Sequence, residues 1–260
     1  MLAHVLPHTI PHPSPISIHK PTQEPISNHP TMASEASNTG GLLLLDFWVS
    51  PFGQRVRIAL AEKNLPYSYV EENLLAGKSD RLLRANPVHK KIPVLLHNDK
   101  PVNESLIIVQ YLDDAFPSSR QLLPPSDDPY ARAHARFWAD YVDKKLYDCG
   151  SRLWKLKGEP QAQARAEMLE ILRTLEAELG EKEFFGGEHG FGFVDVALAP
   201  FTAWFHSYER YGDFKVAEVA PGIEAWAGRV GKRETVAKSL YAPDKVYEFI
   251  GVLKKKYGIE

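Results

Sequence analysis

The stretch LLLLDFWVSPFGQR, residues 42–55, decides the fold of the first half of this chain. It opens with four leucines, a pattern typical of a strand that is buried on both faces. Pro51 then stands where a helix can begin, because the first helical residue needs no amide hydrogen. The stretch therefore predicts a strand that leads into a helix, with Ser50 at the N-terminus of that helix.

Ser50 occupies a position that can stabilise an anion. A helix N-terminus carries about half a positive charge and several unpaired amide hydrogens. A thiol with a pKa near 8.5 is mostly protonated at neutral pH. Lowering that pKa by about two units requires about 2.7 kcal/mol of preference for the thiolate, which a hydroxyl donor at a helix terminus can supply. A serine that only caps the helix is the alternative for this segment taken alone.

Strand and helix patterns alternate in the region that follows. Residues 67–70 alternate like a strand, residues 92–96 form a second apolar run, and Asn-Asp-Lys at 98–100 predicts a turn. A helix is expected from Glu104 to about Asp114. This order predicts a small α/β unit.

The second half of the chain shows only helical periodicity after a segment at 117–129. Helices are expected over 130–157, around 168–179, over 221–230 and over 244–257. A further helix begins at Gly192, with Asp195 accepting hydrogen bonds from its open amides, and Pro200 inside it should produce a kink at a cost of about 3 kcal/mol. The apolar stripe of the first of these helices contains Phe137, Trp138, Tyr141, Val142 and Cys149.

The first 40 residues differ from the rest. They hold 7 of the 20 prolines and 5 of the 10 histidines but no Phe, Tyr or Trp, so they cannot bury enough apolar surface to offset the entropy of ordering. We expect residues 1–40 to be a disordered extension, followed by an α/β domain at 41–118, a linker at 119–129 and a helical domain at 130–260. Met32-Ala33-Ser34 resembles a second start site. The sequence therefore leaves open whether residues 1–31 belong to the natural protein.

Composition excludes several classes of protein. Lys and Arg number 31 against 33 Asp and Glu, so there is no basic field for nucleic acid. A single cysteine cannot form an internal disulfide, and no apolar run approaches the roughly 20 residues that span a bilayer. His4, His8 and His12 have the spacing of a helical metal site, but prolines interrupt that helix, so no metal is expected. We expect a cytoplasmic globular protein that binds neither nucleic acid nor membrane.

A second motif, NPVHKKIPVL at 86–95, places Pro93 at the start of a strand, where a cis bond would expose the backbone of Ile92. Glu104 offers a carboxylate, Ser105 a hydroxyl and a helix-terminal amide, and Lys78 an isolated cation in a loop. With an anion site at the first helix, these groups suit a peptide that has two carboxylates, one ammonium group and a thiol, which describes glutathione. Each residue also has a simpler structural explanation, but together those explanations require four coincidences.

Residues 42–114 resemble the N-terminal domain of plant tau-class glutathione transferases. The resemblance rests on WVSPFGQRVRIAL (48–60), NPVHKKIPVL (86–95) and ESLIIVQY (104–111), and it continues through FWADYVDKK (137–145), FVD (193–195) and VAKSL (236–240). It implies an α/β plus all-α fold: an N-terminal thioredoxin-like domain followed by a C-terminal helical-bundle domain. It also implies a homodimer.

The resemblance assigns a role to each residue of the glutathione site. Ser50 would donate a hydrogen bond to the thiolate, and Lys78 would pair with the glycyl carboxylate. The backbone of Ile92 would bond to the cysteinyl part, beside a cis Pro93.

Glu104 and Ser105 would hold the γ-glutamyl ammonium and carboxylate groups. Glutathione is then a co-substrate, and no metal or other cofactor is implied. The hydrophobic substrate would lie in an aromatic cleft between the domains, and seven positions match its lining: Phe52, Tyr147, Ser151, Trp154, Trp204, Phe249 and Leu253. Core packing is the alternative for each of these seven residues.

The implied activity is conjugation of glutathione to hydrophobic electrophiles, with glutathione-dependent peroxidase activity as an addition. The alternative is a non-catalytic carrier of planar hydrophobic ligands, a ligandin-type protein. A thiol-disulfide reductase on the same fold, such as a dehydroascorbate reductase, needs a cysteine where this chain has Ser50. The glycine-rich segment 186–192 follows a helix rather than a strand, so it predicts a connecting loop and not a dinucleotide site.

Overall fold

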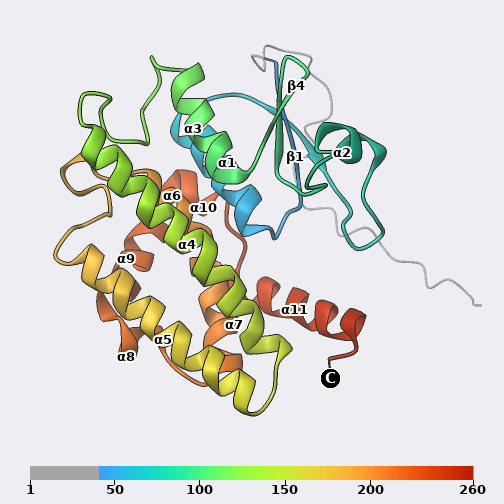
Figure 1. Cartoon of the computed structure of the whole chain (residues 1–260), viewed down its shortest axis with the longest axis vertical. Coiled ribbons are helices and arrows are strands. Elements are labelled where there is room, and N and C mark those ends of the chain that lie inside the picture. Colours follow the sequence, from blue (N-terminus) through green and yellow to red (C-terminus); the bar gives the residue numbers. More distant parts are fainter. Residues whose placement is uncertain (1–40, 260) are drawn as a thin grey trace, which may run out of the picture. The chain divides into compact units, whose positions relative to one another are not determined.

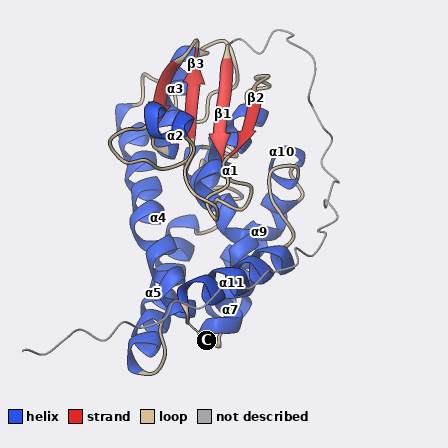
Figure 2. Ribbon diagram, turned by 90° about the vertical axis from the view of Figure 1, so that its right-hand side faces the viewer, coloured by secondary structure: helices blue, strands red, loops and turns tan. Residues whose placement is uncertain are grey.

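The computed structural model of the chain describes residues 41–259, so the expectations for residues 1–40 lie outside it. Within this range the first half contains one four-stranded sheet of order β2-β1-β3-β4 (Figures 1 and 2). β1 pairs in parallel with β2 and antiparallel with β3, and β4 pairs antiparallel with β3. The strands are β1 (Leu42–Asp46), β2 (Ser68–Glu71), β3 (Val94–His97) and β4 (Lys100–Asn103).

Helices cover both faces of this sheet, which explains the run of four leucines. Leu44 packs into the main core with residues of α1 (Pro51–Glu62) and α3 (Ser105–Ala115). Leu45 points to the other face and packs against Leu82 of α2 (Asp80–Ala85). Both leucines are fully buried, so the prediction of a strand buried on both faces is confirmed. The short helix α2 was not expected from the sequence.

The rest of the described chain is helical. Its longest members are α4 and α5, which pack against each other. The helices are α4 (Pro129–Lys155), α5 (Glu159–Leu179), α6 (Phe193–Leu198), α7 (Thr202–Gly212), α8 (Val216–Val219), α9 (Pro221–Gly231), α10 (Glu234–Ala237) and α11 (Pro243–Tyr257). The expected fold class, an α/β unit followed by helices, is therefore confirmed.

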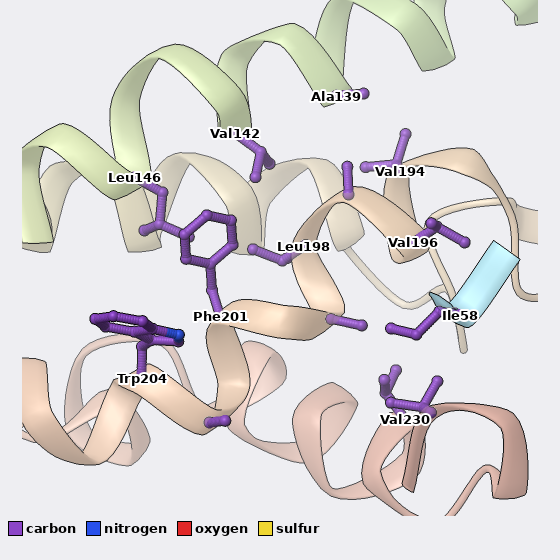
Figure 3. Packing of buried hydrophobic residues seen from close by; sticks show 14 of the residues in the cluster. Ile58, Ala139, Val142, Leu146, Val194, Val196, Leu198, Phe201, Trp204 and Val230 are labelled. Carbon is purple, nitrogen blue, oxygen red and sulfur yellow. The ribbon is translucent and has the colours of Figure 1, made fainter. Parts of the chain in front are cut away.

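The main hydrophobic core is shared by the two halves of the chain. Figure 3 shows Ile58 of α1 among apolar side chains of the helical half, including Val196 of α6 and Val230 of α9. All three are fully buried. The helix that begins after Ser50 is thus held from two sides, which makes it a rigid support for a site.

The break at Pro200 and the cap at Asp195 are both present. Residues 199–201 form a 3-10 turn that separates α6 from α7, as the missing amide hydrogen of Pro200 requires. The Asp195 carboxylate accepts from the amides of Gly192 at 2.9 Å and Phe185 at 3.0 Å, and from the indole of Trp226 at 2.8 Å. Burial raises the pKa of Asp195 although these donors oppose the shift. Asp195 is therefore a structural residue of the helical half.

Two residues of the expected stripe on α4 differ in their surroundings. Cys149 is buried, with its thiol 3.1 Å from the carbonyl of Ala164, and burial raises its pKa to about 12. Such a thiol is inert. Phe137, in contrast, is 60% exposed, because a helix of this length turns part of any broad stripe away from the core. No helix in the described part of the chain is long and apolar enough to cross a membrane.

Candidate active site

Four chain segments meet at one edge of the sheet. β1 and β2 run parallel, with Asp46 opposite Glu71, so both strands end at this edge. β3 begins there, because Val94 pairs with Leu45 near the end of β1. β4 ends there, because Asn103 pairs with Val94. The residues predicted for glutathione follow or precede these strand ends directly, which brings their backbones to the same side of the fold.

Ser50 lies in the turn that leads from β1 into α1. Its backbone is extended, and its hydroxyl oxygen accepts a hydrogen bond from the amide of Gly53 at 3.3 Å. The residue is 8% exposed. Because the oxygen is the acceptor in this cap, the hydroxyl hydrogen remains available to donate to an anion. The capping role and the thiolate role of Ser50 are therefore compatible rather than alternative.

Ile92 and Pro93 precede β3. The peptide bond between them is cis, as the resemblance implies. Pro93 is buried and Ile92 is half-buried. The backbone N–H and C=O of Ile92 lie just outside the strand ladder and bond to no other group among residues 41–259. An extended peptide could pair with them as an added strand does.

Glu104 and Ser105 form the junction between β4 and α3. Glu104 has a φ of 70°, a left-handed conformation that is uncommon and costly for a residue with a side chain. Its side chain is 50% exposed, does not cap α3, and lies 3.4 Å from His89 Nδ1. Ser105 is buried at the first position of α3. A half-exposed carboxylate beside a helix-terminal amide can bind an ammonium and a carboxylate side by side.

Arg55 is a site residue that the sequence analysis did not identify. Its guanidinium is fully buried and donates to Ser105 Oγ at 3.1 Å and to the carbonyl of Ala197 at 2.9 Å. It also forms an ion pair with Asp143 of α4. Burial lowers the pKa of Arg55, against the opposing effect of Asp143. Arg55 thus ties Ser105 to both the first helix and the helical half, and its one sequence signal is a cation on the core-facing side of an apolar helix.

Lys78 lies in the loop between β2 and α2. It is exposed and makes no ion pair with any residue that the structure describes. Ser79 beside it caps α2 by accepting from the amide of Leu82 at 3.0 Å. The structure therefore leaves Lys78 as an available cation near the end of β2 and does not join it to the other predicted residues.

Part of the predicted hydrophobic site forms one cluster. The ring of Phe52 lies 5.0 Å from that of Tyr147, and Tyr147 lies 6.4 Å from Trp204. Ser151 is hydrogen-bonded to Tyr147. Burial raises the pKa of Tyr147, and the bond to Ser151 offsets only part of that rise. Phe52 is the second residue of α1, so the cluster starts two residues from Ser50.

The other predicted members lie apart from that cluster. Phe249 packs on Phe47 and Trp48, each with ring centroids 5.6 Å away, and Leu253 lies one turn further along α11. Trp154 and Trp204 are each 4% exposed, and both belong to the main hydrophobic core. The core-packing alternative therefore describes the positions of both indoles in the structure.

A separate cavity of about 820 Å³ lies between residues 121–128 and helices α4 and α5. It contains none of the residues assigned above, so it is distinct from the candidate site. No group of three or more potential metal ligands lies together within residues 41–259.

Comparisons with known proteins agree with this arrangement. The family model described as "Glutathione S-transferase, N-terminal domain" matches residues 44–120, and "Glutathione S-transferase, C-terminal domain" matches residues 158–229. The chain is 69% identical over 226 residues to "Probable glutathione S-transferase GSTU1" of rice (japonica), which covers 84% of this chain and 97% of that protein. It is 51% identical over 216 residues to "Glutathione S-transferase U19" of Arabidopsis thaliana, covering 83% of this chain and 97% of that protein.

Solved structures give the same result. A crystal structure of rice GST1 in complex with glutathione matches with a TM-score of 0.80 and 69% identity, covering 83% of this chain and 98% of that chain. The tau-class enzyme of mango, Mangifera indica, matches with a TM-score of 0.78 and 39% identity, covering 83% of this chain and all of that one (100%). The chain therefore belongs to the glutathione S-transferase family, and within it to the tau class.

Proposed function

We propose that this protein transfers the glutathione thiolate to hydrophobic electrophiles, with Ser50 as its catalytic residue. The observation that supports this most directly is the position of the Ser50 hydroxyl, whose oxygen is engaged by the first turn of α1 while its hydrogen stays free. The hydroxyl and the helix terminus would both favour the thiolate over the thiol. The enzyme would raise the concentration of the nucleophile rather than change its chemistry.

The remaining contacts would orient the tripeptide. The backbone of Ile92, beside Pro93, would pair with its central residue. Glu104 and Ser105 would hold the γ-glutamyl end, and Lys78 would hold the glycyl carboxylate. In this proposal residues 41–118 bind glutathione, residues 119–129 connect, and residues 130–260 carry most of the second substrate's site.

The aromatic cluster beside Ser50 supports a hydrophobic second substrate. Phe52 and the partly exposed Tyr147 offer ring surface, Trp204 packs beneath Tyr147, and Ser151 is the short polar side chain among them. Holding a planar electrophile against these rings would supply the proximity component of catalysis. The same thiolate could attack an organic hydroperoxide: the O–O bond breaks, an alcohol leaves, and a second glutathione converts the sulfenic acid to a disulfide and water.

A direct test follows the mass of the product. The purified protein is incubated with glutathione and a panel of planar electrophiles, and the expected result is a product heavier by one glutathione minus the leaving group. Tight binding of several electrophiles with no product above the uncatalysed rate would contradict the proposal and favour the ligand carrier.

We also propose a homodimer. Apolar side chains are exposed on α3 and the start of α4, namely Ile107 at 55%, Tyr130 at 79% and Phe137 at 60%. Exposed apolar groups on neighbouring helices are typical of an interface, and self-association is the commonest way to cover them. Light scattering should give twice the chain mass, and Phe137→Glu should shift it toward the monomer, while Val252→Glu, at an exposed apolar residue of α11, should not.

A cytoplasmic location and a role in detoxification complete the proposal. The single cysteine is buried and free, so the described fold depends on no disulfide and is suited to a reducing compartment. Fractionation of cells that produce the protein should place it with cytoplasmic markers, and cells that lack it should be more sensitive to the electrophiles that it conjugates.

A further inference from the structure

Asp46 is a buried carboxyl group at the edge of the sheet, and it has no role in the reaction proposed above. It is the last residue of β1 and is fully buried. Neither carboxylate oxygen makes a hydrogen bond of normal geometry with residues 41–259, although Arg57 and the backbone of Phe47 both favour its charged form. A buried carboxyl group with so few good donors is costly to keep, so its position requires an explanation.

The Asp46 carboxyl group lies directly against the first turn of α1. Gly53 faces it, and a methyl group added to Gly53 would collide with the carboxylate. The amide of Gly53 is the donor that Ser50 Oγ accepts. Asp46 therefore touches the residue whose amide donates to the Ser50 hydroxyl oxygen.

Arg57 joins Asp46 to the turn that carries Ser50. Its Nε lies 3.2 Å from Asp46 Oδ2, and its Nη2 donates to the carbonyl of Trp48 at 2.6 Å. The amide of Trp48 donates to Glu71 at 3.0 Å, so the turn is held from both sides. The Asp46–Arg57 ion pair is therefore bonded directly to the turn that carries Ser50.

The charged and titratable groups around Asp46 come from three elements. Arg57 faces it from α1, and Glu71 and Tyr69 face it from β2. Tyr67 lies just before β2, and Tyr241, in the segment before α11, acts on Arg57. Burial raises the pKa of Asp46 to about 7, against the lowering effect of Arg57. Its charge therefore changes in the pH range in which the transferase reaction would run.

We propose that Asp46 is a positioning residue for the thiol of glutathione: it supports the Gly53–Ser50 cap, and its charge is coupled to the charge of the bound sulfur. This proposal rests on the proposed function, because it takes the thiolate to lie at Ser50. Two negative groups near one helix terminus disfavour each other, so loss of a proton by one group makes the other hold its proton more tightly. The released thiol proton goes to solvent, and Asp46 takes up a proton from solvent in response.

The test uses Asp46→Asn, which keeps the shape of the side chain and removes the charge. The thiolate of the glutathione complex is titrated by its ultraviolet absorbance, and the pH profile of kcat/KM is measured beside it. The midpoint for thiolate formation should fall by about one pH unit in the variant, a shift of the size that a nearby like charge produces. Asp99→Asn makes the same chemical change in an exposed turn at the opposite edge of the sheet and should leave the midpoint in place.

Two other results would overturn the coupling. One is an unchanged midpoint in Asp46→Asn. The other is a fall in kcat/KM at every pH with no shift, which would mean that Asp46 is only structural. A wild-type complex that shows no lowered thiol midpoint, or a Ser50→Ala variant that keeps the wild-type midpoint, would instead contradict the proposed function, so the two failures are distinguishable.

A second measurement needs no variant of Asp46. Carboxyl NMR follows the titration of Asp46 in wild-type protein bound to glutathione or to S-methylglutathione, which has no ionisable thiol. Coupling predicts a higher midpoint for Asp46 with glutathione. Equal midpoints with the two ligands would refute the proposal even if Asp46→Asn failed to fold.

Discussion

Replacing Ser50 with alanine removes two interactions, and the free energy of each can be given separately. The first is the cap, in which the amide of Gly53 loses its acceptor at 3.3 Å; losing a serine cap costs about 1 kcal/mol of stability. The second is the hydroxyl donor to the thiolate. A hydrogen bond to a charged group contributes about 1.5–3 kcal/mol, which corresponds to a rise of about one to two units in the pKa of the bound thiol.

The assay follows from that shift. With a wild-type pKa lowered to about 6.5, the thiolate fraction at pH 6.5 should fall about 5- to 50-fold, and kcat/KM for a chlorinated nitrobenzene should fall by the same factor. The KM for glutathione should change little, because the proposed contacts at Ile92, Glu104 and Ser105 remain. As the pH approaches about 8.5, near the pKa of a free thiol, the gap between variant and wild type should narrow, because more thiolate forms without help.

Asp128→Ala is the matched control for the lost cap. Asp128 caps α4 by accepting from the amide of Ala131 at 2.8 Å, far along the chain from the proposed thiol. This variant should lose stability by a similar amount and keep wild-type kinetics. The argument about Ser50 would be refuted if Ser50→Ala kept the wild-type kcat/KM at pH 6.5 and bound glutathione normally.

Three further predictions concern groups that support the site. Arg55→Leu removes an ion pair with the partly exposed Asp143 and a buried bond to Ser105 at 3.1 Å, so it should destabilise the fold by about 1–3 kcal/mol and raise the KM for glutathione; an unchanged KM in the folded variant would contradict its positioning role. Gly150→Ala would bring a methyl group into the ring of Tyr208, and this overpacking should lower the free energy of unfolding by about 1–3 kcal/mol. An unchanged denaturant midpoint would show that no such loss occurs. Burial raises the pKa of Asp46 from 3.8 to about 7. Ionising it therefore opposes folding, and the free energy of unfolding should fall as pH rises from about 4 to about 7, by up to about 1.4 kcal/mol per unit. Asp46→Asn should not show this fall. If the free energy of unfolding in urea depends on pH equally in the two proteins, the prediction is wrong.

The longer elements were predictable because their signals are local. The leucines of β1 and the proline at position 51 carry the preferences of a buried strand and a helix start. Gly192 and Asp195 mark the start of α6, and Pro200 marks its end. Each of these depends on the residue itself and its near neighbours, so no knowledge of the fold was needed.

The short helices and the exposure of Phe137 were not predictable in the same way. α8 and α10 have four residues each, which is about one turn and too short to show a period. Phe137 is apolar and has the right spacing, yet 60% of it is exposed. Whether such a residue faces the core or the surface depends on what packs against its helix.

For the site, the residues proposed to hold glutathione could be predicted from the sequence, because proline, glutamate and serine have distinct chemistry at strand ends and helix starts. It could not show that Arg55 reaches Ser105, Ala197 and Asp143, which are far apart in the chain. Nor could it show that Asp46 lies against Gly53, or that Phe52 and Tyr147 meet while Trp154 and Trp204 both pack in the core. Local preferences are set by neighbours in the sequence, whereas contacts between distant residues arise only when the helices and the sheet pack together and bury their shared core.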